Sequence, residues 1–247
     1  MRNRITVYYQ YGEQMRFFFV TGMLVVLVLS ILCAGSAEQI PDAKSQAENV
    51  WNGSWSTEYY IVSILQNGSE IEGRYEPKDI KSMDPGRLAG MVSKDGTIFS
   101  GIWTESGPLS VSISDDGMSF TGNGGVRIDG GMNESGAYTT NTTRIGTVLD
   151  PENIWSGTWK GARTENVWIQ EGTTITGSYH PLPGIADEPG LFEGTVSDDG
   201  KMATGTWKEF GNFSFTLSRD GTFFNGTYDV ALNASAGSDF WNGTKIQ

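Results

Sequence analysis

The chain has 247 residues and is rich in aromatic side chains, with eight Trp, nine Tyr and twelve Phe, which predicts a folded protein with an apolar core. Its formal net charge is −12, and because residues 1–37 contain three Arg and one Glu, the remainder carries −14. A surface this acidic repels phosphate backbones and anionic headgroups, which argues against nucleic-acid binding and peripheral membrane binding. The 33 glycines and the lack of 3.6-residue periodicity beyond the N-terminus favour strands over helices.

The N-terminal segment has the pattern of an export signal. Residues 17–34 form an apolar run after a basic stretch, and Gly35-Ser36-Ala37 supplies small residues for cleavage before Glu38. The run of 18 residues is also long enough to cross a bilayer if it is retained. We therefore expect a secreted or cell-surface protein, with residues 1–37 as a signal peptide or as a membrane anchor, and contact with the membrane through residues 17–34 alone.

The sequence contains an internal repeat. At an offset of 104 residues, 48–122 aligns with 152–226 without a gap, with 28 identities in 75 positions. This predicts a leader over 38–47, a first module over 48–145, a linker over 146–151 and a second module over 152–247. We call the two modules the first copy and the second copy. The single cysteine, Cys33, lies in the apolar run, so no intramolecular disulfide can form, which favours a prokaryotic source.

Both copies show the period-two alternation of half-buried strands, clearest over 212–218. In the second copy the expected strands are Trp155–Gly161, Val167–Gln170, Thr173–His180, Leu191–Ser197, Met202–Glu209, Asn212–Ser218 and Thr222–Val230, with a possible eighth over Asp239–Ile246. The first copy parallels it and has Gly136–Arg144 as its possible eighth strand. This predicts an all-β protein of two tandem antiparallel up-and-down meander barrels, each of seven or eight strands. A pair of β-sandwiches is the alternative.

Short motifs support this fold class. Four Ser-x-Asp-Gly segments, at 93–96, 114–117, 197–200 and 218–221, predict hairpin turns, because Gly accepts the positive φ that such a turn needs. Triplets such as Ile175-Thr176-Gly177-Ser178-Tyr179 place a Gly between two large residues on one strand face. We expect strong coiling of the strands there, with a neighbouring aromatic side chain lying over the bare backbone.

The opening of each copy resembles the avidin and streptavidin barrels and, more loosely, the lipocalin-like (calycin-type) group. The matching residues are Gly53-Ser54-Trp55 and Glu72-Gly73-Arg74-Tyr75 in the first copy, and Gly157-Thr158-Trp159 and 175–179 in the second, about 25 residues of each copy. The resemblance implies a small up-and-down barrel. It does not imply biotin binding, because the biotin-contacting Asn of that family falls on Thr57 and Gly161.

Aromatic side chains in the inward strand phase are the candidate ligand-binding residues, although a packed core explains them as well. These candidates are Trp55, Tyr75, Trp103, Trp159, Tyr179 and Trp207. The lone histidine, His180, is expected in a solvated loop, so neither a zinc site nor a Ser-His-Asp triad is expected, and no cofactor. Paired carboxylates are the remaining basis for hydrolytic chemistry, and Glu105 and Glu209 recur after the Trp of the fifth expected strand of each copy.

Eight Asn-x-Ser/Thr sequons are candidate glycosylation sites, a number that period-two strands rich in Asn, Ser and Thr partly explain. They begin at Asn52, Asn67, Asn133, Asn141, Asn212, Asn225, Asn233 and Asn242. Surface glycosylation fits an archaeal cell surface better than a bacterial one. The favoured function is a non-enzymatic, extracytoplasmic binding or surface module for a small apolar or aromatic ligand or a glycan. A structural or adhesive envelope glycoprotein with solid barrels is the second hypothesis, and a carboxylate-based hydrolase is the third. A cavity of a few hundred Å³ lined by the aromatic side chains would distinguish the first from the second.

Overall fold

The computed structural model describes residues 49–79, 84–128, 131–148, 150–185, 188–231 and 239–246. Contacts divide the chain into residues 1–43 and 44–247, and every described residue belongs to the second unit. The described residues are all-β, with antiparallel strands and no helix. Among them, therefore, no helix is long and apolar enough to span a membrane. The expected signal segment lies outside the described residues.

Within the described residues, fifteen strands form one antiparallel sheet. Seven lie in the first copy: β1 (Gly53–Thr57), β2 (Tyr60–Asn67), β3 (Glu70–Pro77), β4 (Gly86–Val92), β5 (Ile98–Ile113), β6 (Ser119–Ile128) and β7 (Gly131–Ile145). Eight lie in the second copy: β8 (Gly157–Gly161), β9 (Thr164–Glu171), β10 (Thr174–Pro181), β11 (Gly190–Val196), β12 (Met202–Leu217), β13 (Phe223–Tyr228), β14 (Asp239–Phe240) and β15 (Gly243–Lys245).

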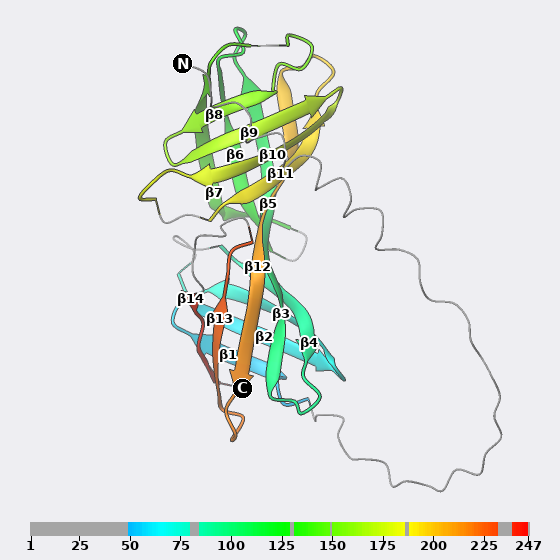
Figure 1. The fold of residues 1–247 in the computed structure, drawn as a ribbon, viewed down its shortest axis with the longest axis vertical. Helices are drawn as coiled ribbons and strands as arrows, with labels where there is room; N and C mark the ends of the chain where they lie inside the picture. Colours follow the sequence, from blue (N-terminus) through cyan, green and yellow to red (C-terminus); the bar gives the residue numbers. More distant parts are fainter. Residues whose placement is uncertain are drawn as a thin grey trace, which may run out of the picture. The chain divides into compact units, whose positions relative to one another are not determined.

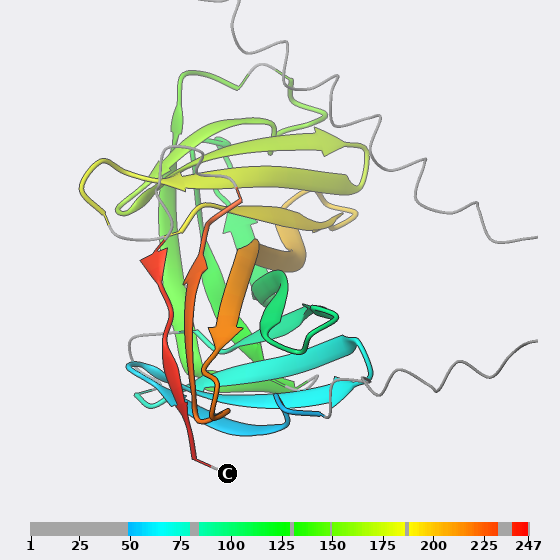
Figure 2. The same cartoon turned by 60° about the horizontal axis from the view of Figure 1, so that its bottom comes forward.

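The hydrogen-bonded neighbours form two closed circuits, and each circuit contains strands from both copies (Figures 1 and 2). The first circuit runs β1-β2-β3-β4-β5-β12-β13-β15 and returns to β1. The second circuit runs β8-β9-β10-β11-β12-β5-β6-β7 and returns to β8. Strands β5 and β12 belong to both circuits and extend from one into the other in Figure 1.

The expectation of one closed module within 48–145 and another within 152–247 therefore needs a correction. The sequence suggests two strands joined at Glu209–Asn212, but β12 is one strand of 16 residues, and so is β5. The first half of β5 pairs with β4 and its second half with β6. Because the chain continues straight where a hairpin was expected, the second half of each copy closes on the other copy, as in a domain swap within one chain.

The pairing of β5 with β12 is symmetric about its centre. Glu105 lies opposite Glu209, and these two residues are equivalent at the 104-residue offset. On one side of them Trp103 pairs with Gly211, and on the other Trp207 pairs with Gly107. The offset exchanges these two pairs, so the strands are related by a local two-fold axis at the two glutamates.

Two separate core clusters follow the circuits rather than the sequence copies. The first contains Trp51 and Trp55 from the first copy together with Phe215 and Phe224 from the second. The second core joins residues of both copies in the same way: Val111, Ile113 and Phe120 with Trp155, Trp159, Trp168, Ile175, Phe192, Val196 and Ala203. The exchanged halves thus bury their apolar faces against the partner copy, and this burial stabilises the exchanged arrangement.

The four Ser-x-Asp-Gly turns are confirmed. In each, the Ser hydroxyl donates to the Asp side chain two residues later at 2.6 Å, and the Gly has a φ between +68° and +79°. The hydrogen bonds lower the pKa of the four Asp carboxyls, for example that of Asp116. The aromatic ring expected over the bare backbone of the glycine triplets is present at Gly177, where an added Cβ would collide with the ring of Trp168.

Candidate functional site

A cavity of about 900 Å³ is lined by residues of both circuits. It lies where β5 and β12 pass from one circuit to the other, because Trp103, Glu105, Trp207 and Glu209 are all in its wall. In the part of the chain that the structure describes, thirteen aromatic side chains line it: Tyr59, Tyr60, Tyr75, Trp103, Phe120, Tyr138, Trp168, Tyr179, Phe192, Trp207, Tyr228, Phe240 and Trp241. The cavity is thus shared by the copies, whereas the sequence suggested a separate interior for each.

Two equivalent tyrosine–glutamate pairs face the cavity. The Tyr75 hydroxyl donates to Glu105 Oε1 at 3.0 Å, and the Tyr179 hydroxyl donates to Glu209 Oε1 at 2.7 Å. Each tyrosine lies on the third strand of its copy, where a glycine of the next strand leaves room for the phenol: a Cβ at Gly86 would collide with the Tyr75 hydroxyl. The repeat therefore builds the same hydrogen bond twice, on either side of the local two-fold axis.

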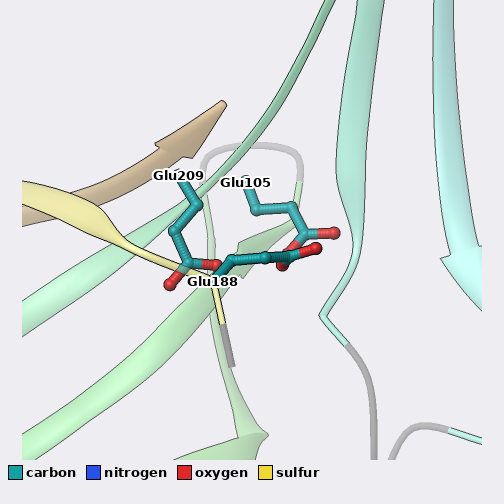
Figure 3. Close-up of side chains that lie close together, drawn as sticks. All are labelled: Glu105, Glu188 and Glu209. Carbon is teal, nitrogen blue, oxygen red and sulfur yellow. The ribbon is translucent and has the colours of Figure 1, made fainter. Parts of the chain in front are cut away.

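A third glutamate completes a carboxylate cluster. Glu188, just before β11, places a carboxylate oxygen within 4.8 Å of oxygens of Glu105 and Glu209 (Figure 3). Glu105 is buried, with 7 % of its surface exposed. Its pKa is raised well above the ordinary value, first by desolvation and then by the charges of Glu188, Glu209 and Asp84, against the opposing hydrogen bond from Tyr75. The cluster therefore favours a bound proton or another positive charge.

Asp84 is the counterpart of Glu188 at the 104-residue offset and also lines the cavity. Burial raises the pKa of its carboxyl. The two copies thus each contribute one acid from the β5–β12 pair and one from the segment before the fourth strand of the copy. Asp84 and Glu188 are both carboxylic acids but differ in side-chain length, so the cavity is only approximately symmetric.

The six candidate aromatic residues separate into two groups. Trp55 and Trp159 have no exposed surface and do not line the cavity; each indole N–H instead donates to the backbone four residues earlier. Tyr75, Trp103, Tyr179 and Trp207 line the cavity. The indole N–H groups of Trp103 and Trp207 donate to the carbonyl oxygens of Asp229 and Gly125, each across to the other copy.

Several cavity residues were not singled out from the sequence. Asp84 and Glu188 were visible only as an aligned pair of acids at the offset, a weak signal among many charged positions. Trp241 lies after the gapless part of the repeat. Its counterpart in the first copy is Thr140, because β15 pairs with β1 in the same way as β7 pairs with β8. Its indole N–H is buried and has no hydrogen-bond partner among the described residues.

The sequons mostly lie on the surface of the described strands. Exposed asparagines are Asn67, Asn141, Asn212, Asn225 and Asn242. Asn52 is half-buried, and its side-chain oxygen accepts a hydrogen bond from the backbone of Gln66. The side chain of Asn133 and the whole of Asn233 lie outside the described residues. His180 is exposed at the end of β10 rather than in a loop.

Comparison with known proteins finds no matching family model, no matching curated protein and no matching solved structure.

Proposed function

We propose that the protein is an exported, extracytoplasmic binding protein that holds one small, partly aromatic ligand in the cavity shared by its two copies. Each strand circuit then serves as a closed up-and-down barrel of eight strands, and residues 1–37 direct export. The observation that carries the proposal is the cavity itself: about 900 Å³ lined by aromatic side chains and a few convergent polar groups. A solid envelope module needs no such space.

The composition of the wall supports a specific rather than a purely apolar site. Tyr75 and Glu105, with their counterparts Tyr179 and Glu209, present fixed polar groups inside an otherwise aromatic surface. Such groups orient a ligand, while the rings supply the contact area that binds it. One cavity for two copies predicts one ligand per chain, where separate barrel interiors would predict two.

Native mass spectrometry of the secreted protein tests this proposal, because it reports a retained small molecule and its stoichiometry together. Binding of the neutral apolar dye Nile red gives a second measurement. Thr140→Trp should narrow the cavity, because Thr140 lines it and is the counterpart of Trp241. Thr143→Trp is the matched control, since Thr143 is exposed on β7 and outside the wall.

We expect Thr140→Trp to weaken dye binding and Thr143→Trp to preserve it, with both variants folded by circular dichroism. Equal binding by both variants would show that the dye binds elsewhere. A wild-type protein that retains no molecule and binds no dye would overturn the proposal in favour of a structural envelope protein.

A second candidate is a hydrolase that uses Glu105 and Glu209. The specific observation is that the two carboxyls face one cavity at close range, as the acid and the nucleophile of a retaining glycosidase do at about 5–5.5 Å. The raised pKa of Glu105 is the property that a general acid needs. Hydrolysis of p-nitrophenyl glycosides by the wild type that is lost in both Glu105→Gln and Glu209→Gln would establish this activity. A wild-type turnover no higher than that of the double variant Glu105→Gln/Glu209→Gln would exclude this substrate class.

A further inference from the structure

Among the described residues, most charged side chains of the cavity wall are carboxylates. They are Glu58, Asp84, Glu105, Glu188 and Glu209, and Arg163 also lines the wall. A cleft lined by one sign of charge and bounded by apolar walls focuses the field, which concentrates ligands of the opposite sign. The site therefore disfavours anions and attracts cations.

The rest of the wall fits an organic cation better than a bare metal ion. Calcium takes about six to eight oxygen ligands, often including backbone and amide oxygens, whereas here the carboxylates are surrounded by aromatic side chains. An ammonium group gains from the faces of Trp and Tyr, especially where water is excluded. The chain already packs its own cations in this way, with the Arg144 guanidinium 4.0 Å from the ring centre of Trp159.

A second observation, independent of the acids, also points to a ligand. Trp241 lines the cavity and is 9 % exposed, and its indole Nε1 is buried without a hydrogen-bond partner among the described residues. Its ring centre lies 5.1 Å from that of Tyr75, whose hydroxyl binds Glu105. A buried donor without an acceptor is costly, and an acceptor atom on a ligand would relieve that cost.

We infer that the ligand is an organic cation, with its charged nitrogen at the cluster of Glu105, Glu188 and Glu209 and its apolar body against the aromatic side chains of the wall. The inference rests on the proposed function, because it names the chemical class of the ligand held in the same cavity. An acceptor atom on the ligand would be the natural partner for the N–H of Trp241.

A charge series of matched probes tests this on the full secreted chain: 2-phenylethylammonium, 2-phenylethanol and 3-phenylpropionate, titrated by calorimetry at neutral pH. We expect the ammonium to bind at least about tenfold more tightly than the alcohol, because a desolvated cation–aromatic contact alone contributes on the order of that factor. The carboxylate should bind most weakly. Calcium chloride alone is titrated in parallel.

The double variant Glu105→Gln/Glu209→Gln should lose most of the preference for the ammonium. Glu72→Gln/Glu193→Gln is the control, since it removes the same charge from two exposed positions on β3 and β11 outside the cavity. If the glutamine double variant does not fold, the wild-type charge series decides by itself.

The outcomes separate the inference from the proposed function. Equal binding of the alcohol and the ammonium would overturn the cation inference and leave the binding function standing. Calcium binding that is lost in the cavity variant and kept in the control would also overturn it, in favour of a metal site. No binding of any probe, together with a secreted protein that retains no molecule, would overturn both.

Discussion

The exchange of strands between the copies predicts which aromatic side chains are energetically coupled. Phe120 and Trp159 belong to different copies, yet their ring centroids lie 4.9 Å apart in an edge-to-face arrangement. Trp55 is the counterpart of Trp159 in the same copy as Phe120, and it lies in the other core cluster. If each copy closed on itself, Phe120 would instead pack against Trp55.

Double-mutant cycles measure this difference. An edge-to-face aromatic pair contributes about 0.5–1.5 kcal/mol beyond the area that it buries. We therefore expect a coupling of that size between Phe120→Leu and Trp159→Leu. Phe120→Leu and Trp55→Leu should be additive within about 0.3–0.5 kcal/mol, the usual agreement for independent sites. Each single change should destabilise by less than the roughly 3–5 kcal/mol of truncation to Ala.

The assay is equilibrium urea unfolding of the wild type, the three single variants and the two double variants, compared at equal m-values. Leucine keeps most of the apolar volume, so the double variants should remain folded in water. Coupling between Phe120 and Trp55, with additivity between Phe120 and Trp159, would refute the exchanged arrangement.

Three further predictions concern stability. Because burial and the charges of Glu188 and Glu209 raise the pKa of Glu105, the native state binds this proton more tightly than the unfolded chain, and stability falls as pH rises from 4.5 through the raised pKa. Glu105→Gln should reduce this dependence of the unfolding free energy on pH, because a pKa change of one unit corresponds to about 1.4 kcal/mol of stability. Melting temperatures measured across this pH range test the prediction, and a pH dependence equal to that of the wild type would contradict the assignment. Gly90→Ala should destabilise more than Gly221→Ala as judged by urea midpoints: an added Cβ at Gly90 meets the paired backbone of β5, whereas at Gly221 it meets nothing within 4 Å and only a φ of +70° is required, which costs an L-residue about 1–2 kcal/mol. Since β5 and β12 run through both circuits, calorimetry should show one unfolding transition, and two resolved transitions would argue against shared strands.

The local structure of this protein was predictable from its sequence. Alternation and Asp-Gly turns depend on residues close in the chain, so β10 and β11 begin and end within one residue of the expected Thr173–His180 and Leu191–Ser197. The turn at 197–200 likewise has the expected hydrogen bond and positive φ. Period-two burial and turn geometry are local properties, and a single copy contains all the information that they need.

Partner choice was not predictable, because the repeat makes it degenerate. Phe120 and Phe224 are equivalent, and either could pack against Trp55 or against Trp159 with the same side-chain chemistry. The packing partner depends on whether the chain turns or continues at Glu209. One alternating run ends there and another begins, and this pattern fits a turn and a continuous strand equally well. Only the three-dimensional pairing of β5 with β12 shows that it continues.

The same choice creates the candidate site. In a copy closed on itself, Glu105 and Glu209 would lie in different barrels, and each would be a strand-end glutamate beside one tyrosine. Antiparallel pairing of β5 with β12 instead places the two residues opposite each other and brings Glu188 to within 4.8 Å of both. The cavity therefore belongs to the duplicated chain and to neither copy alone, which explains why the polar residues of one copy, considered separately, indicated no site.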